Sequence, residues 1–178
     1  MADSFGFYGA SAFDLGADHT YRPEKGKELL DPTTLGADHV SLETALAKVP
    51  LSDATNRFHK KPPPAWILYR CILEYADQTG NWPTEATAEE FAEKVRAWIK
   101  DVSPSLLGHE LLNDTSLRGV AKVATCEVAP VCAVLGGIIG NECIKAISGK
   151  GEPANNTVLF DGLTCKAWTF LVKPKEEE

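Results

Sequence analysis

Hydrophobic residues recur at helical spacing in two neighbouring segments near the middle of the chain. The first predicted helix begins at Pro64, where a first turn tolerates a missing amide hydrogen, and ends around Gln78-Thr79-Gly80-Asn81. Its apolar face comprises Ile67, Leu68, Cys71, Ile72 and Tyr75. The second helix is predicted to start where Thr87 and Glu90 form a capping box, and to bury Phe91, Val95, Trp98 and Ile99.

A later segment, from Ala129 to Ile147, is apolar on nearly every side and also predicts a helix. A helix of that kind is usually buried all round, in a core or at a subunit interface. One or two shorter helices are expected between residues 110 and 125, after Ser103-Pro104-Ser105 ends the preceding helix.

β-Branched and aromatic residues predict strands near both ends of the chain. Asn156 to Phe160 and Ala167 to Val172 flank the turn residues Asp161-Gly162, which predicts a β-hairpin. Near the N-terminus, the expected strand pieces are Ser4 to Tyr8 and Thr20 to Tyr21.

Composition and charge exclude some functions. A net charge of −7 and a pI near 5.1 argue against non-specific nucleic-acid binding, which needs a basic face to displace counterions. The apolar run from Val128 to Ile139 is expected to be too short to span a bilayer before Asn141 and Glu142. Five cysteines without a C-x-x-C pair suggest neither disulfides nor zinc, which fits reduced thiols inside a cell.

Three glycines interrupt the most apolar helix, and each costs about 1 kcal/mol relative to alanine in a helix interior. Gly136 and Gly140 stand four residues apart, with Gly137 between them. That spacing bares the backbone on one face and lets another element approach closely. Two interpretations stay open: packing against a sheet of the same chain, or contact with another subunit.

Neither a nucleotide site nor a reactive thiol is predicted. The segment Gly149-Lys150-Gly151 continues with Glu152 and Pro153, so it lacks the G-x-G-x-x-G pattern and is interpreted as a loop. Cys132 lies in a first helical turn, where the dipole can lower a thiol pKa. Its neighbours Val131, Ala133 and Val134 suggest burial instead, which favours an inert thiol.

The sequence around the glycine-bearing helix resembles a known family. Ala129 to Ile138, followed by Glu142 to Ile147, looks like the late helix of the small, non-catalytic subunit of SUMO-activating enzymes. Pro153, Asn155-Asn156 and Phe160-Asp161-Gly162 then follow at the spacing of that family. Phe5 to Gly9, with Leu15-Gly16, is similar to the segment that follows the nucleotide-fold half. The resemblance is therefore to the C-terminal portion of that subunit, within the ubiquitin-activating, ThiF-like adenylation superfamily.

This resemblance implies a fold and a domain division. The fold expected is α/β, a partial doubly wound adenylation-type (ThiF or Rossmann-like) domain with a helical insertion and a C-terminal β-hairpin. Residues 1–50 would be a remnant of the α/β domain with a connecting segment. Residues 51–125 would form the helical insertion, and residues 126–178 the C-terminal part of the adenylation-type domain.

The resemblance also implies a function and a partner. The chain is expected to be an accessory subunit without activity of its own, in a heterodimer with a large catalytic subunit and indirectly with SUMO, in the nucleus and cytoplasm. ATP and magnesium are implied at the partner, and no catalytic, cofactor-binding or metal-binding residue is assigned to this chain. The expected partner-interface residues are Pro130, Cys132, Gly136, Gly137 and Gly140. The alternatives are part of another ThiF-like adenylating enzyme, or a plain protein-interaction domain.

Overall fold

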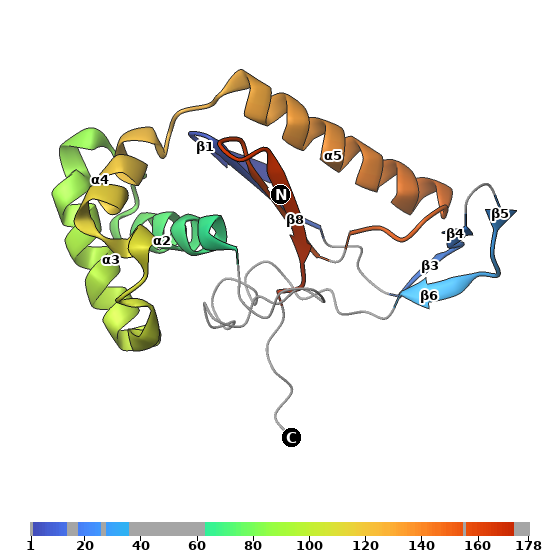
Figure 1. Cartoon of the computed structure of the whole chain (residues 1–178), viewed down its shortest axis with the longest axis horizontal. Coiled ribbons are helices and arrows are strands. Elements are labelled where there is room, and N and C mark those ends of the chain that lie inside the picture. Colours follow the sequence, from blue (N-terminus) through green and yellow to red (C-terminus); the bar gives the residue numbers. More distant parts are fainter. Residues whose placement is uncertain (1, 14–17, 26–27, 36–62, 155, 173–178) are drawn as a thin grey trace.

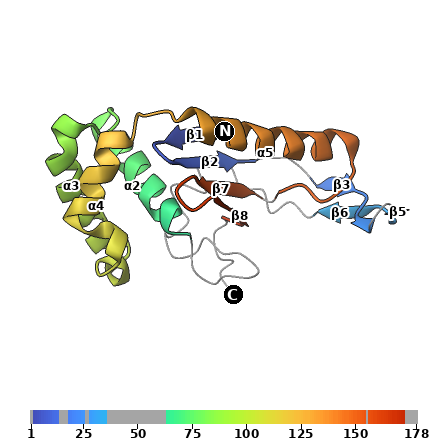
Figure 2. The same ribbon diagram turned by 45° about the horizontal axis from the view of Figure 1, so that its top comes forward.

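The structure is a computed structural model, and it describes residues 2–13, 18–25, 28–35, 63–154 and 156–172. Three helices gather at one end of the molecule, a sheet lies in the middle beneath a long helix, and small β-ribbons lie at the other end (Figures 1 and 2). The mixed α/β class predicted from the sequence is confirmed.

The main sheet joins the two ends of the chain. Its four strands have the order β1-β2-β7-β8, and every neighbouring pair is antiparallel. Their bounds are Ala2–Phe5 for β1, Tyr8–Ala12 for β2, Thr157–Asp161 for β7 and Lys166–Phe170 for β8. The predicted C-terminal hairpin is confirmed as β7 and β8. The strand predicted over Ser4 to Tyr8 is wrong, because a turn divides it: Gly6 has φ of +59°, which an L-residue rarely adopts.

Two small ribbons complete the described strands. β3 (His19–Tyr21) pairs with β6 (Thr33–Leu35), and β4 (Glu24–Lys25) pairs with β5 (Glu28–Leu29). Both pairs are antiparallel, so within the described residues the only parallel pairing is two isolated bridges, Gly6 with Glu127 and Arg22 with Lys150. The described strands therefore do not by themselves form the parallel sheet of a doubly wound domain.

Four α-helices are described, and all match helices predicted from the sequence. They are α2 (Pro64–Thr79), α3 (Ala88–Val102), α4 (Asp114–Val123) and α5 (Ala129–Ser148), with 3₁₀ turns at Glu85–Thr87, Pro104–Leu106 and Glu110–Leu112. Gly80 ends α2 in the left-handed conformation, at φ of +70°. Asn113 caps α4 by accepting a hydrogen bond from the amide of Ser116.

The capping box lies one turn earlier than predicted. The amide of Thr84 donates to Oγ1 of Thr87 at 2.9 Å, which closes a box around the 3₁₀ turn before α3. Thr87 makes no side-chain cap for α3 itself. Glu90 instead accepts a hydrogen bond from the Tyr75 hydroxyl of α2 at 3.3 Å. The predicted pair of Thr87 and Glu90 is thus wrong, because a second threonine upstream starts the helix through a 3₁₀ turn.

Aromatic side chains attach α2 to the face of the sheet opposite α5. The ring of Tyr69 stacks on Phe5 of β1 with centroids 5.2 Å apart, and Trp66 meets Phe170 of β8 edge-on at 5.4 Å. A Cβ placed on Gly9 of β2 would point toward α5, and Gly9 pairs with Ser4 of β1. Because side chains alternate along a strand, Phe5 points the other way. The sheet is therefore covered by α5 on one face and by α2 on the other.

Asp3 of β1 makes stability depend on pH. Burial raises the pKa of its carboxyl. Hydrogen bonding from the Ser4 amide at 2.8 Å and from the Tyr69 side chain partly offsets this, and nearby Glu127 raises the pKa further. A raised pKa in the folded state means that protonated Asp3 stabilises the fold. This contribution is complete below the ordinary carboxyl pKa and is lost as pH rises through the folded-state value.

Asp3→Asn should therefore be more stable than the unmodified protein at pH 7, and the difference should shrink as pH falls toward 3. Asparagine keeps a side-chain oxygen for the Ser4 amide while it removes the charge. Urea unfolding at a series of pH values measures the effect. A variant that is less stable at pH 7 would contradict the assignment.

Candidate partner interface

A proline and a glycine define the two ends of helix α5. Pro130 lies in its first turn, where the fixed φ of proline suits a helix start, and Gly149 ends it in the left-handed conformation at φ of +62°. The preceding residue, Val128, is extended and provides no side-chain cap. The helix therefore has defined limits although it lacks an amphipathic pattern.

The inner face of α5 packs on the main sheet through a few residues. Val131 and Leu135 are buried there, and they lie against two glycines, one in β2 and one in the turn between β7 and β8. A Cβ placed on Gly9 would lie 3.1 Å from Cδ2 of Leu135, and one on Gly162 would lie 2.9 Å from Cγ2 of Val131. The glycines that permit this close packing are therefore in β2 and in the β7–β8 turn, and not in α5.

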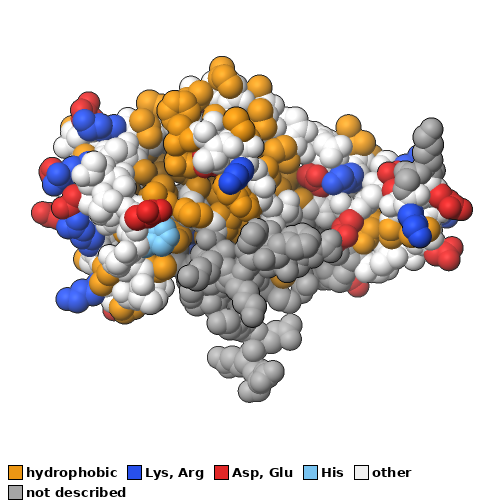
Figure 3. All heavy atoms as spheres, in the orientation of Figure 1, with side chains coloured by type: hydrophobic (Ala, Val, Ile, Leu, Met, Phe, Trp, Pro, Cys, Tyr) orange, Lys and Arg blue, Asp and Glu red, His pale blue; other side chains and the backbone are white. Residues whose placement is uncertain are grey.

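The outer face of α5 is apolar and exposed. Ile144 is 65% exposed, Ile147 is 88% exposed and Val134 is 43% exposed. Hydrophobic side chains accordingly gather over the helix in the space-filling view (Figure 3). The prediction that this helix is buried on every side is wrong for the chain alone, because the sheet covers only one of its faces.

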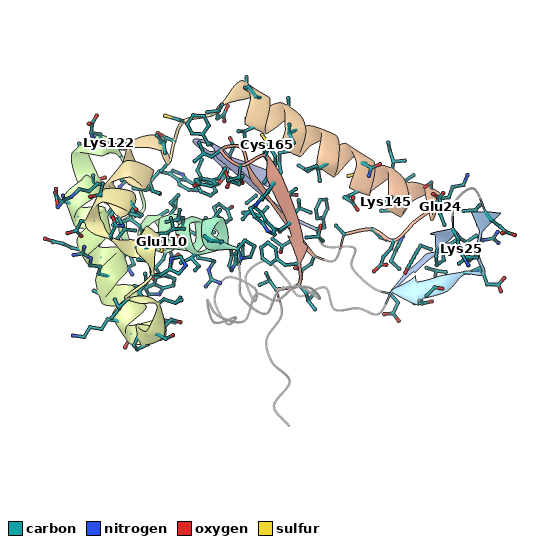
Figure 4. All side chains as sticks on the ribbon, in the orientation of Figure 1. Glu24, Lys25, Glu110, Lys122, Lys145 and Cys165 are labelled. Atoms are coloured by element: carbon teal, nitrogen blue, oxygen red, sulfur yellow. The ribbon has the colours of Figure 1, made fainter. Side chains whose placement is uncertain are left out.

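Charged side chains do not interrupt this outer face. The charged residues of α5 are Glu142 and Lys145, which pair with each other at 2.7 Å. Figure 4 labels Lys145 near the C-terminal end of the helix. Glu142 is buried, and its second carboxylate oxygen accepts a hydrogen bond from the Ala154 amide at 2.7 Å. The ion pair therefore faces the loop between α5 and β7.

A groove of about 340 Å³ opens beside this ion pair. It lies between the C-terminal half of α5 and the end of β2, and its lining includes Ile139, Cys143 and Phe13. Glu142 is the charged side chain in the lining, and its carboxylate is already bound to Lys145 and Ala154. The groove therefore offers no free charged group for a ligand.

The three helix glycines lie on the open side of α5. Among the described residues, a Cβ placed on Gly136, Gly137 or Gly140 would meet nothing within 4 Å. The described sheet therefore does not pack against these glycines. Their bare backbone faces outward, where another molecule can approach it.

The other two predicted interface residues, Pro130 and Cys132, differ in their exposure. Pro130 is exposed like the glycines, whereas Cys132 is half-buried, with its Sγ 3.4 Å from Oγ of Ser4 on β1. The burial expected around this thiol is confirmed for Val131 but not for Ala133 and Val134, which are exposed. Cys132 therefore borders the sheet side of the helix, one helical turn before Gly136.

Several exposed apolar residues were not predicted as interface residues. They are Val134, Ile144 and Ile147 on α5, and Phe7 and Leu163 on the turns of the main sheet. In a helix that is apolar all round, the hydrophobic pattern does not reveal which face a sheet will cover. The turn residues gave no pattern at all, since single apolar residues in turns are common on protein surfaces.

The described residues give little support for a reactive thiol, a metal site or a phosphate site at a helix N-terminus. Burial raises the pKa of the Cys71 thiol to about 12, so it is not a thiolate at neutral pH. Within residues 2–13, 18–25, 28–35, 63–154 and 156–172, no group of three or more His, Cys, Asp or Glu side chains could hold a metal ion. Gly149 follows a helix instead of preceding one, so the Gly149-Lys150-Gly151 loop presents no helix N-terminus to a phosphate.

By length and composition alone, α5 could also cross a membrane. The sequence-based expectation that its apolar run is too short considered only the residues before Asn141. The contacts of Val131 and Leu135 with the sheet identify α5 as part of a packed fold with one open face. Because the inner face packs on the sheet and the outer face is apolar, we interpret the outer face as a surface that contacts protein and not lipid.

Comparison with known proteins gives one consistent result. No protein-family model matches the chain. SUMO-activating enzyme subunit 1 of Xenopus laevis is 31% identical over 183 residues, which cover 91% of this chain and 52% of that protein. The Homo sapiens protein of the same name is 30% identical over 195 residues, covering 97% and 55%. The Danio rerio protein is 28% identical over 185 residues, covering 90% and 51%. The chain thus spans about half the length of the curated relatives it matches.

Proposed function

We propose, from its homology to SUMO-activating enzyme subunit 1 over 90% to 97% of its length, that this chain acts as part of an accessory subunit in SUMO activation. The subunit has no catalytic activity of its own. It pairs with a large catalytic subunit that carries out ATP-dependent adenylation and thioester formation for protein sumoylation. The single observation that carries this proposal is the match itself, because the relatives are by name subunits of that enzyme.

The outer face of α5 is the proposed contact with the large subunit. Two features support it: an apolar stripe exposed along a long helix, and glycines whose backbone nothing in the described residues covers. Exposed apolar patches of this kind mark interaction sites in soluble proteins. We propose Pro130, Gly136, Gly137 and Gly140 as interface residues, with Cys132 at the border toward the sheet.

The finer parts of the proposal concern the whole assembly. ATP and magnesium bind at the large subunit, and this chain contributes no residue that we assign to them. The described sheet and helices form part of a doubly wound adenylation-type domain. The complex acts in the nucleus and cytoplasm.

Co-expression with the large catalytic subunit of a SUMO-activating enzyme tests the proposal. The chain should copurify with that subunit, and Val134→Glu should weaken binding by at least about tenfold, as buried interface anchors do. Val102→Glu is the matched control: Val102 is 44% exposed and Val134 is 43% exposed, but Val102 ends α3, away from α5. The control should bind within about twofold of the unmodified chain, as surface changes outside an interface usually do.

Two results would count against the proposal. One is a chain that elutes alone from a mixture with the large subunit. The other is exchange of pyrophosphate into ATP by the purified chain, since that activity belongs to an adenylating enzyme and not to an accessory subunit.

A further inference from the structure

We propose that a pocket at the C-terminal end of α5 binds a phosphate group, and that Arg22 and Lys150 hold it. The group is the dianion of inorganic phosphate or of a phosphate monoester. This site goes beyond the proposed function and does not depend on it, because neither Arg22 nor Lys150 belongs to α5 and its outer face.

The pocket lies where the small β-ribbons meet the end of α5 (Figures 1 and 2). It has a volume of about 400 Å³. Its lining includes Thr20, Arg22 and Leu29 on the ribbon side, and Ser148 and Lys150 on the helix side. Arg22 and Lys150 are the charged residues of the lining. The charge that lines the pocket is therefore all positive, in a chain whose net charge is −7.

Backbone hydrogen bonds fix the two cations side by side. The amide of Arg22 donates to the carbonyl of Gly149 at 2.8 Å, and the amide of Gly151 donates to the carbonyl of Arg22 at 2.9 Å. Arg22 and Lys150 are thereby partners in a parallel β-bridge. Because the partners in a bridge project their side chains to the same face, the two charges lie next to each other.

This arrangement costs the chain stability when no anion is bound. Like charges directly opposite each other repel. In the described part of the chain, neither Arg22 nor Lys150 forms an ion pair that would offset the repulsion. The dipole of α5 attracts a cation to the helix C-terminus, which accounts for Lys150 but not for a second cation from another segment. A dianion bound between them would offset both charges.

A phosphate group matches the pocket in charge and in hydrogen bonding. A phosphate monoester carries about −1.5 to −2 charges at pH 7, which balances two cations. The planar guanidinium of arginine donates two parallel hydrogen bonds to phosphate, and the ammonium of lysine adds a compact charge. Thr20 contributes a hydroxyl to the same lining.

The carbonyl groups at the end of α5 are the features that would oppose an anion. The carbonyl of Gly149 accepts the hydrogen bond from the Arg22 amide. The carbonyl of Lys145 accepts one from the hydroxyl of Ser148 at 3.5 Å. Because these two carbonyls already have donors, the side-chain cations dominate the charge that a ligand meets.

Titration of the isotope-labelled chain with inorganic phosphate at constant ionic strength, followed by NMR, tests the proposal. The amides of Arg22, Lys150 and Gly151 should shift and saturate. Arg22→Gln and Lys150→Gln should each raise the dissociation constant by at least about tenfold, because each removes a charge-assisted hydrogen bond. Arg22→Lys should fall between Arg22→Gln and the unmodified chain, because it keeps the charge and loses the planar fork.

Lys100→Gln is the matched control. Lys100 is exposed in the last turn of α3 and is not in an ion pair within the described residues. Its replacement changes the net charge by the same amount, but on the helical part of the chain. The control should bind phosphate within about twofold of the unmodified chain, because salt screens a distant surface charge. In chloride, Arg22→Gln should unfold at the same temperature as the unmodified chain or higher, because the repulsion is gone.

A parallel titration with phosphoserine distinguishes the two sources of the group. Tighter binding of phosphoserine than of inorganic phosphate would assign the site to a phosphorylated protein side chain, and the reverse order would assign it to the free ion. Either result supports the site. Amides of Arg22, Lys150 and Gly151 that do not saturate with either probe would overturn the proposal. Equal dissociation constants for the unmodified chain, Arg22→Gln and Lys150→Gln would also overturn it, and neither result bears on the role in SUMO activation.

Discussion

Gly162→Ala is expected to lower the free energy of unfolding by about 1–3 kcal/mol, the usual cost of forcing an extra group into a packed site. A Cβ at this position would lie 2.9 Å from the carbonyl oxygen of Phe7 and 2.9 Å from Cγ2 of Val131. The oxygen belongs to the backbone, so it cannot move aside as a flexible side chain would. The hydrogen bond from the Gly162 amide to that same oxygen would have to lengthen.

Urea unfolding of the variant gives the measurement, and a glycine on the opposite side of α5 gives the control. Gly136→Ala is the same substitution in the same region, but its Cβ would meet nothing within 4 Å in the described part of the chain. It should raise stability, because alanine favours a helix interior. Equal effects at the two positions would show that α5 does not pack on the sheet as described.

The limits of the helices could be predicted because their ends carry strong local signals. Pro64 and Pro130 lie in first turns, and Gly80 and Gly149 end their helices in the left-handed conformation. These effects depend on the backbone of one or two residues, so no tertiary contact is needed to recognise them.

The capping of α3 shows where local signals mislead. Thr84 and Thr87 both have hydroxyls that can cap, and Glu90 stands at the right distance from Thr87 for a box. In the structure Glu90 accepts from Tyr75 of α2, and Thr87 closes a box with Thr84. The choice depended on a contact between two helices, which sequence spacing does not contain.

The candidate interface could be predicted only in part. The apolar character of α5 and its glycines indicated a close contact, but every face of that helix is apolar, so the sequence could not tell the sheet side from the open side. The pairing of β2 with β7, across a separation of nearly the whole chain, decided it. Phe7 and Leu163 became visible only when those strands placed their two turns together.

The glycines of α5 lead to the second large effect, a variant that gains stability and loses its partner. Gly136, Gly137 and Gly140 replaced together by alanine should raise the free energy of unfolding by about 1 kcal/mol at each position. Their Cβ atoms would meet none of the described residues within 4 Å, so no steric cost from those residues offsets the gain. For a chain of this length the midpoint of thermal unfolding should rise by roughly 2–4 °C for each kcal/mol.

Binding to the large catalytic subunit should fall in the same variant, because three methyl groups would occupy the space that the bare backbone leaves for a close contact. Gly119→Ala is the matched control: Gly119 lies inside α4, and its Cβ would also meet no atom of the described residues within 4 Å. It should raise stability without changing binding. If the triple variant gains stability and binds fully, the glycines face no partner, and the interface must lie elsewhere on the chain. If stability rises and binding falls in the triple variant, and in no other, then the three glycines are there for partner binding. The stability that they cost the helix would be explained by that role.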